Sequence, residues 1–152
     1  MIGLLQRVDG AAVEVDGRES ARIGKGLLVL IGVERGDDES VADRLLERLV
    51  TYRVFADGEG RMNLSLADTR GALLLVPQFT LAADTSKGLR AGFSRAAEPA
   101  QAERLFGYMA KRAEKRLPDA QSGQFGAHMR VSLVNDGPVT FWIRVPPHEA
   151  AE

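Results

Sequence analysis

Two short stretches of uninterrupted apolar residues constrain the fold of this chain most strongly. GLLVLIGV, residues 26–33, is bounded by glycines and has the length of a strand that is buried on both faces. ALLLVPQFTL, residues 72–81, predicts the next strand, which ends in the polar side chains of Gln78 and Thr80 around Phe79. An apolar strand that ends in an amide and a hydroxyl is typical of a simple strand-to-loop transition or of the floor of a pocket.

Apolar residues at helical spacing predict two helices. The first covers residues 38–50, and Asp37 or Asp38 can cap its start. The second covers residues 99–117 and begins with Pro99, a residue that suits the first helical position. Its buried stripe is expected to comprise Ala102, Leu105, Phe106, Met109 and Ala113.

The remaining elements are expected to be strands. A hairpin with its turn at Asp16-Gly17 is a strong local signal. Further strands are expected at residues 2–8, 52–55, 129–135 and 139–145. This order predicts one α/β domain over residues 1–146, with a mixed sheet, helices on one side and a second sheet layer, a three-layer α/β/β architecture. Residues 147–152 are expected to form a flexible tail.

The composition excludes several classes of site and partner. The chain has no cysteine and only two histidines, so a zinc site or a Ser-His-Asp triad is not expected, and no metal or cofactor is predicted. The net charge of −1 argues against a protein that coats nucleic acid along its length, although a grip on one nucleic-acid end needs only a few contacts. No apolar run approaches a membrane span, and the start carries no export signal, so we expect a cytoplasmic protein without a membrane partner.

The stretch NDGPVTFW, residues 135–142, is open to two interpretations. Pro138 is compatible with an ordinary turn that leads into a strand. The alternative is a cis Gly137-Pro138 bond, which would turn the two flanking carbonyls to the same side. Such a pair of acceptors could recognise an ammonium group or exclude a substituent of the wrong chirality.

PQFTLAADT, NDGPVTFW, RMNLS, QRV near the start and GLLVLIGV together resemble the D-aminoacyl-tRNA deacylases of bacteria and eukaryotes. The resemblance covers the chain from Met1 to about Val145 in the same order. It implies a metal-free homodimer that hydrolyses the ester between a D-amino acid, or glycine, and the 3′-terminal adenosine of tRNA. This reaction serves chirality proofreading in translation.

The resemblance also implies a site at the dimer interface. Gln78, Phe79 and Thr80 of one subunit would form the catalytic strand end. Gly137 and Pro138 of the partner would exclude L side chains.

Two departures from the family pattern stand out. Pro77 replaces the usual serine, and Ala91-Gly92 replaces a Pro-Ser pair in the loop GLRAGFS.

The residues themselves favour electrostatic over covalent catalysis. Thr80 is the only candidate nucleophile in the motif, and an unassisted threonine hydroxyl is weak, so we expect it to position water or substrate. The N–H groups of Phe79 and Thr80 could form an oxyanion hole, and the ribose 2′-hydroxyl of the substrate lies beside the ester.

Further residues have both a binding and a structural interpretation. Arg7, expected at the end of the first strand, is either a surface arginine or a support for the Gly-Pro turn near the pocket. Phe125 could stack on adenine and Met129 could line the same pocket, or both could be core residues. The long loop after residue 82 carries Lys87, Arg90 and Arg95, which could meet tRNA phosphates or simply be solvated.

Three functions are therefore considered: a D-aminoacyl-tRNA deacylase, a non-catalytic dimeric module that binds nucleotides or RNA ends, and a general metal-free esterase. The whole-chain resemblance favours the first. The second would bind aminoacyl-tRNA without turnover. The third would cleave simple esters without regard to chirality.

Overall fold

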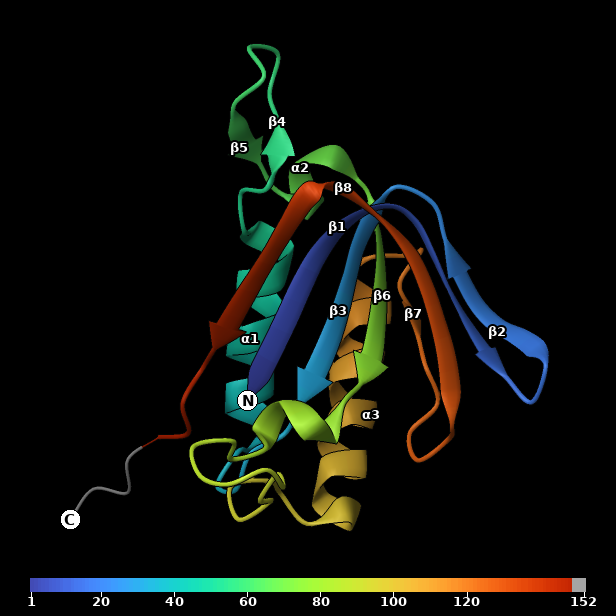
Figure 1. Ribbon diagram of the computed structural model, residues 1–152. Helices are drawn as coiled ribbons and strands as arrows, with labels where there is room; N and C mark the ends of the chain where they lie inside the picture. The colour runs from blue at the N-terminus through green and yellow to red at the C-terminus, as the bar shows by residue number, and fades with distance from the viewer. Residues whose placement is uncertain (149–152) are drawn as a thin grey trace.

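A mixed sheet with two long helices on one face forms the centre of the computed structural model, which describes residues 1–148 (Figure 1). The strand order is β2-β1-β3-β6-β7, with β8 on the other edge of β1. β3 and β6 run parallel, as do β6 and β7, whereas β1 is antiparallel to its neighbours. The strands are β1 (Ile2–Val15), β2 (Arg18–Ile23), β3 (Gly26–Gly32), β6 (Ala72–Pro77), β7 (Gln121–Ser122) and β8 (Met129–Arg144).

The first strand organises the sheet because it pairs along both edges. On one edge, residues 2–8 pair with β3 and residues 11–15 pair with β2. On the other edge, β1 pairs with both halves of β8, from Ile2 opposite Arg144 to Val15 opposite Met129. The turn into β2 lies at Asp16-Gly17, as predicted, and both residues have positive φ angles, 51° and 75°.

Both predicted helices are confirmed. In α1 (Glu39–Thr51), the Asp38 side chain caps the start by accepting a hydrogen bond from the Val41 N–H at 2.9 Å. α3 (Pro99–Arg116) starts at Pro99, and the predicted stripe is its buried face. The two helices pack on the face of the sheet that carries Leu5, Leu27 and Leu73, and together they enclose the larger core.

A second apolar core lies on the face of the sheet away from the helices. Leu28, Leu74 and Val76 of the sheet contribute to it. They are covered by the distal half of β1, by β2 and by the first half of β8, through residues such as Val13 and Ile23. The same strands therefore form both the central sheet and a layer that folds back over it. This arrangement confirms the predicted α/β/β layering and explains why Leu27, Leu28, Val29 and Ile31 of β3 are almost completely buried.

A buried cluster of charges closes the sheet at Met1. The Met1 amino group donates to Asp37 Oδ1 at 2.8 Å, to Glu34 Oε2 at 3.2 Å and to the Val145 carbonyl at 2.8 Å. Asp37 Oδ2 accepts the Glu34 N–H at 2.7 Å, and the Arg144 guanidinium binds the Glu34 carboxylate. Burial raises the pKa of Asp37, while the ammonium group and the Glu34 N–H oppose that rise. Asp37 is therefore part of this cluster and does not cap the helix.

Several predicted boundaries were wrong. The strand predicted over 72–81 ends at Pro77 and is followed by a 3-10 helix, η1 (Phe79–Ala82). The strand predicted at 52–55 begins only at Phe55, as β4 (Phe55–Ala56). The two strands predicted at 129–135 and 139–145 are one strand, because both halves pair with β1 in the same direction. Arg7 lies in the middle of β1 and not at its end.

The connections contain short elements that the sequence did not indicate. β5 (Met62–Leu64) pairs with β4 in a small separate sheet that projects from one end of the molecule, and α2 (Leu66–Thr69) follows it. Of the predicted flexible tail 147–152, the ring of His148 lies 3.2 Å from the Ser40 hydroxyl. Residues 149–152 lie outside the described part of the chain.

Candidate functional site

The polar end of β6 turns sharply away from the sheet. The Gln78 N–H donates to the Ile31 carbonyl at 2.8 Å, which continues the pairing with β3 one residue past Pro77. η1 then crosses the end of β3 at Gly32, where a Cβ atom would lie 2.8 Å from Leu81 Cβ. The glycine at this position therefore permits η1 to sit against the strand and to present Phe79 and Thr80 beyond the edge of the sheet.

A cavity of about 640 Å³ opens beside this turn. Its lining is mainly apolar and comes from the end of β6, the start of α3 and the residues around the start of β8. This volume and character are those of a site for a small organic ligand. Gln78, Phe79, Phe125 and Met129, all expected from the sequence to be site residues, line it together with Pro77, Phe93 and His128.

Aromatic rings form much of the cavity wall. Phe79 and Phe93 are 61% and 43% exposed, and their ring centroids lie 5.2 Å apart at the rim. Phe125 packs against Phe106 at 6.5 Å, so it belongs both to the core and to the cavity wall. Phe93 and His128 were not among the residues predicted for the site. An aromatic residue inside a polar, irregular loop is the one signal that could have identified Phe93.

Thr80 lies outside the cavity lining but is hydrogen-bonded to Gln78, which is part of it. The Gln78 side-chain amide donates a hydrogen bond to the Thr80 hydroxyl. Within residues 1–148, no carboxylate or imidazole is hydrogen-bonded to that hydroxyl, so no general base activates it. The first N–H groups of a 3-10 helix have no partner within the helix, and in η1 these belong to Phe79 and Thr80.

A second predicted group of residues surrounds the middle of β8. The Gly137-Pro138 bond is cis, and β8 bulges here, since Val8 faces Asn135 while Gln6 already faces Thr140. Arg7 lies opposite this bulge. Its Nε donates to the Asp136 carbonyl at 2.9 Å and its Nη1 donates to the Val54 carbonyl at 2.6 Å. Arg7 thus fastens the segment, as the resemblance suggested.

Asn135 also holds the bulge, and the sequence analysis did not identify it. Its Oδ1 accepts the Val139 N–H at 2.7 Å, and its Nδ2 donates to the Thr140 hydroxyl at 2.9 Å. The side chain thereby bridges the residues on both sides of Gly137-Pro138. An asparagine directly before an Asp-Gly-Pro sequence was the signal available for this role.

The two groups of predicted residues do not meet within one chain. Arg7 is level with Leu27 and Leu73 at the beginning of β3 and β6, whereas Gln78 follows the end of β6. At a rise of ~3.3 Å per residue, the five residues from Leu73 to Gln78 span roughly 16 Å. Figure 1 shows the bend of β8 and the helix η1 at opposite ends of the sheet. Within a single chain, Arg7 therefore does not lie beside the cavity that Gln78 lines, and the prediction that it lies near a pocket shared by two subunits stays a prediction.

An apolar row crosses the sheet face that is turned away from the helices. Trp142, Leu4 and Leu30 are aligned across β8, β1 and β3. Trp142 is 57% exposed, and the two leucines are only partly buried. This row adjoins neither long helix.

The described part of the chain contains neither a metal-ligand group nor a membrane-spanning helix. Among residues 1–148, no three histidine or acidic side chains are grouped as metal ligands would be. None of the helices in this part of the chain is both long and apolar enough to cross a bilayer.

Comparison with known proteins gives a consistent result over nearly the whole chain. The family model described as D-Tyr-tRNA(Tyr) deacylase matches residues 4–144. A D-aminoacyl-tRNA deacylase of Thioalkalivibrio sulfidiphilus is 62% identical over 97% of this chain and 99% of its own length. A D-aminoacyl-tRNA deacylase of Nitrosococcus oceani is 59% identical over 97% of this chain and 95% of its own length.

Two solved structures share the fold. The c-Myc DNA Unwinding Element Binding Protein superimposes with a TM-score of 0.91 at 34% identity, covering 96% of this chain and 99% of its own. A probable eukaryotic D-amino acid tRNA deacylase superimposes with a TM-score of 0.79 at 17% identity, covering 93% and 98%. The likeness to the second structure concerns the fold alone.

Proposed function

The chain belongs to the D-Tyr-tRNA(Tyr) deacylase family, and we propose that it hydrolyses the ester between a D-amino acid, or glycine, and the 3′-terminal adenosine of tRNA. The observation that carries this proposal is the 62% identity to a D-aminoacyl-tRNA deacylase over nearly the full length of both chains. The activity removes D-residues before they enter proteins, and we place it in the cytoplasm, where translation occurs.

The terminal adenosine is proposed to occupy the cavity beside β6. Its lining is apolar and aromatic, which suits a base that must be unstacked and held against a π face. Phe125, in a loop, and Met129, at the start of β8, both contribute to this lining. Adenosine in this position leaves its ribose and the ester close to Gln78 and Phe79.

Ester cleavage is proposed to depend on charge stabilisation. The N–H groups of Phe79 and Thr80 at the start of η1 donate to the carbonyl oxygen as it becomes negative, and one such donor contributes about 3 kcal/mol. Water attacks the carbonyl carbon, and the leaving 3′-oxygen takes a proton with the help of the neighbouring ribose 2′-hydroxyl. Thr80 positions this arrangement through Gln78. The donors in this mechanism are the N–H groups of Phe79 and Thr80. It therefore needs neither an N–H group, which Pro77 lacks, nor the hydroxyl of the serine usual at that position.

Chiral selection is proposed to come from a partner subunit. Gly137 and Pro138 lie at the other end of the sheet from Gln78, so they can face an ester only in another copy of the chain. A two-fold axis through the face that carries Trp142 would bury the exposed apolar row and bring the bend of β8 in one subunit to η1 of the other. The carbonyls of the Gly137-Pro138 segment would then receive the substrate ammonium and exclude an L side chain.

The fixed position of this segment supports a selective role. Arg7 and Asn135 hold it with three hydrogen bonds between 2.7 and 2.9 Å, and a fourth of 2.6 Å anchors Arg7 to the Val54 carbonyl. A filter that distinguishes enantiomers must keep its position to within a fraction of an ångström. The hydrogen bonds of Arg7 and Asn135 provide such positioning without any contact to the substrate.

The test compares matched D- and L-tyrosyl-tRNA, with a chelator present, by release of tyrosine. Release from the D form only supports the proposal. Equal release from both identifies an esterase without chiral selection. Binding of tRNA without release from either identifies a binding module. Light scattering on the same sample measures the mass, and a monomer that retains full D-selectivity would contradict the cross-subunit filter.

A further inference from the structure

The segment between η1 and α3 contains a well-built loop, residues 84–92. Asp84 and Gly92 exchange two backbone hydrogen bonds, of 2.7 and 3.0 Å, which close the loop at its base. Inside it, Asp84 Oδ1 accepts the Ser86 N–H at 3.0 Å, and Gly88 adopts a φ of 68°. Hydrogen bonds from Ser86 hold the pKa of Asp84 below its ordinary value, so its carboxylate stays ionised, and bound to the loop, to a lower pH than an ordinary aspartate.

The two cations of this loop, Lys87 and Arg90, form no ion pair with the residues that the structure describes. Residues 85–92 are all exposed, and Leu89 at the tip is fully exposed. Within residues 1–148, no carboxylate lies within ion-pair distance of Lys87 or Arg90. The nearby Arg35 differs, because it pairs with Glu98 at 3.6 Å. Residues 84–95 carry three cations and one carboxylate in a chain whose net charge is −1.

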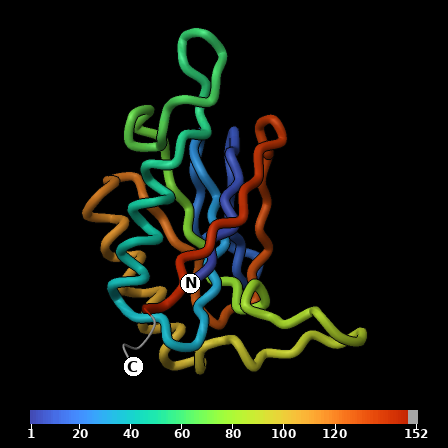
Figure 2. The backbone as a smooth tube through the Cα atoms, turned by 90° about the vertical axis from the view of Figure 1, so that its left-hand side faces the viewer, coloured from blue at the N-terminus to red at the C-terminus, as the bar shows by residue number. Residues whose placement is uncertain are grey.

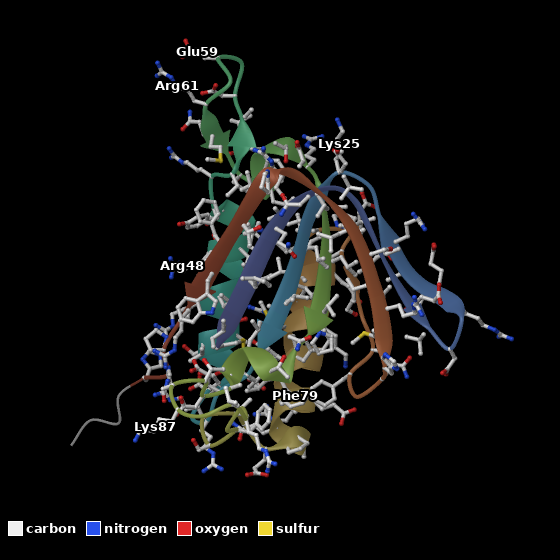
Figure 3. The ribbon with its side chains drawn as sticks, in the orientation of Figure 1. Lys25, Arg48, Glu59, Arg61, Phe79 and Lys87 are labelled. Atoms are coloured by element: carbon white, nitrogen blue, oxygen red, sulfur yellow. The ribbon has the colours of Figure 1, made fainter. Side chains whose placement is uncertain are left out.

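The loop starts at the rim of the cavity and returns to it. It leaves η1 directly after Ala82, and its return strand brings Phe93 against Phe79 at 5.2 Å. Figure 2 shows this segment projecting on the side of the sheet opposite the helices. Figure 3 shows Lys87 well apart from Phe79, and Lys87 is not part of the cavity lining. A chain that leaves the cavity past the Phe79–Phe93 ring pair therefore meets the cations of the loop next.

On these observations, and resting on the function proposed above, we propose that loop 84–92 binds the backbone of the single-stranded nucleotides that precede the terminal adenosine. Lys87 and Arg90 contact their phosphates, and the exposed Phe79–Phe93 pair offers a stacking surface for the penultimate base. Aromatic faces beside cations that follow a backbone are the usual means of binding single-stranded nucleic acid. The loop thus makes recognition depend on the tRNA end as well as on the ester.

The experiment uses a series of substrates: D-tyrosyl esters of adenosine, of a CCA trinucleotide and of full tRNA. The measured quantity is the ratio of kcat/KM for the trinucleotide to kcat/KM for adenosine. In the double variant Lys87→Ala/Arg90→Ala, we expect this ratio to fall about tenfold, and the slope of log kcat/KM against log salt to decrease by about 1.4. Lys111→Ala/Lys115→Ala, on the exposed face of α3, removes the same charge and should change neither quantity.

An unchanged ratio in the loop variant would overturn the proposal. An equal fall for all three substrates, accompanied by a lower mass in light scattering, would also overturn it and identify the loop as a contact between subunits. If the unaltered protein cleaves none of the three esters, the proposed function fails. Binding of a fluorescent, unesterified RNA ending in CCA then tests the proposed phosphate contact independently of catalysis. Weaker binding by the loop variant alone supports the phosphate contact, and equal binding by all variants rejects it.

Discussion

Two groups of charged and polar residues border β1, and they differ in what surrounds them. The cluster of Met1, Glu34 and Asp37 is buried, and its groups satisfy one another. The group around Arg7 and Asn135 holds Gly137 and Pro138, which are exposed. Removing a group from the first should therefore change the stability of the fold. Removing a group from the second should change the position of an exposed segment and leave the core intact.

The largest effect is expected for Asp37→Asn. Asp37 accepts two hydrogen bonds, from the Met1 amino group and from the Glu34 N–H, whereas an amide offers only one acceptor to these two donors. One buried donor would face the amide nitrogen, so the free energy of unfolding should fall by about 3 kcal/mol. Urea unfolding measures this change. Glu47→Gln, in the exposed ion pair with Arg116, should cost less than ~1 kcal/mol. An equal decrease in the free energy of unfolding in the two variants would contradict the proposed difference between the buried cluster and exposed ion pairs.

A smaller effect, on activity, is expected for Gly137→Ala. Gly137 has a φ of 143°, and an added Cβ would lie 2.8 Å from Val139 Cγ2 and 2.9 Å from the Val139 nitrogen. The segment must shift, and we expect the D-over-L ratio of kcat/KM to fall roughly a hundredfold, about 2.7 kcal/mol. The control is Gly58→Ala, where an added Cβ would have no described atom within 4 Å. An unchanged ratio in an intact dimer would place chiral selection elsewhere.

Arg7→Lys should have an intermediate effect. A lysine has no fork of donors, so it cannot reach both the Asp136 and Val54 carbonyls as Arg7 does. We expect kcat/KM for D-tyrosyl-tRNA to fall about tenfold with little change in melting temperature. Arg22→Lys, in an exposed pair with Glu19, provides the matched control and should retain full activity. A large drop in melting temperature would assign Arg7 to the stability of the fold.

The smallest effect is expected for Thr80→Ala. Among residues 1–148, the one side chain hydrogen-bonded to this hydroxyl is Gln78, which donates to it, so its loss should reduce kcat less than tenfold. Thr80→Ser keeps the hydroxyl and should match the unaltered protein. Single-turnover kinetics with D-tyrosyl-tRNA measures both. A loss of more than a thousandfold in the alanine variant, with binding intact, would instead make Thr80 a nucleophile.

The hydrophobic pattern of the sequence predicted those helices and strands whose buried faces follow from the spacing of apolar residues along the chain. The residues of α3 that recur at helical spacing form its buried face. The glycine-bounded run 26–33 is a strand, β3, which ends one residue earlier than predicted. The end of β6 and the continuity of β8 depend instead on pairing across the sheet, with Ile31 and with β1. Sequence spacing contains no information on such pairing.

The candidate site likewise has a part that the sequence predicted and a part that depends on strand pairing. Gln78, Phe79, Phe125 and Met129 were expected together, and they line one cavity. The separation of Gly137 from that cavity could not be read from the sequence, because it follows from the register of Arg7 with Leu27. Phe93 was missed because it acts through a contact with Phe79 that forms only in the folded chain, whereas Asn135 had a local signal, its position directly before Asp-Gly-Pro, that was not used.

The double pairing of β1 also determines when the fold can be completed during synthesis. The first strand made, Ile2–Val15, needs the last, Met129–Arg144, along one whole edge. At ~5–20 residues per second, that edge stays unpaired for several seconds after β1, β2 and β3 have formed. An unpaired apolar edge is a site for association between nascent chains, so slow translation or a truncated C-terminus should yield aggregates before it yields inactive monomers.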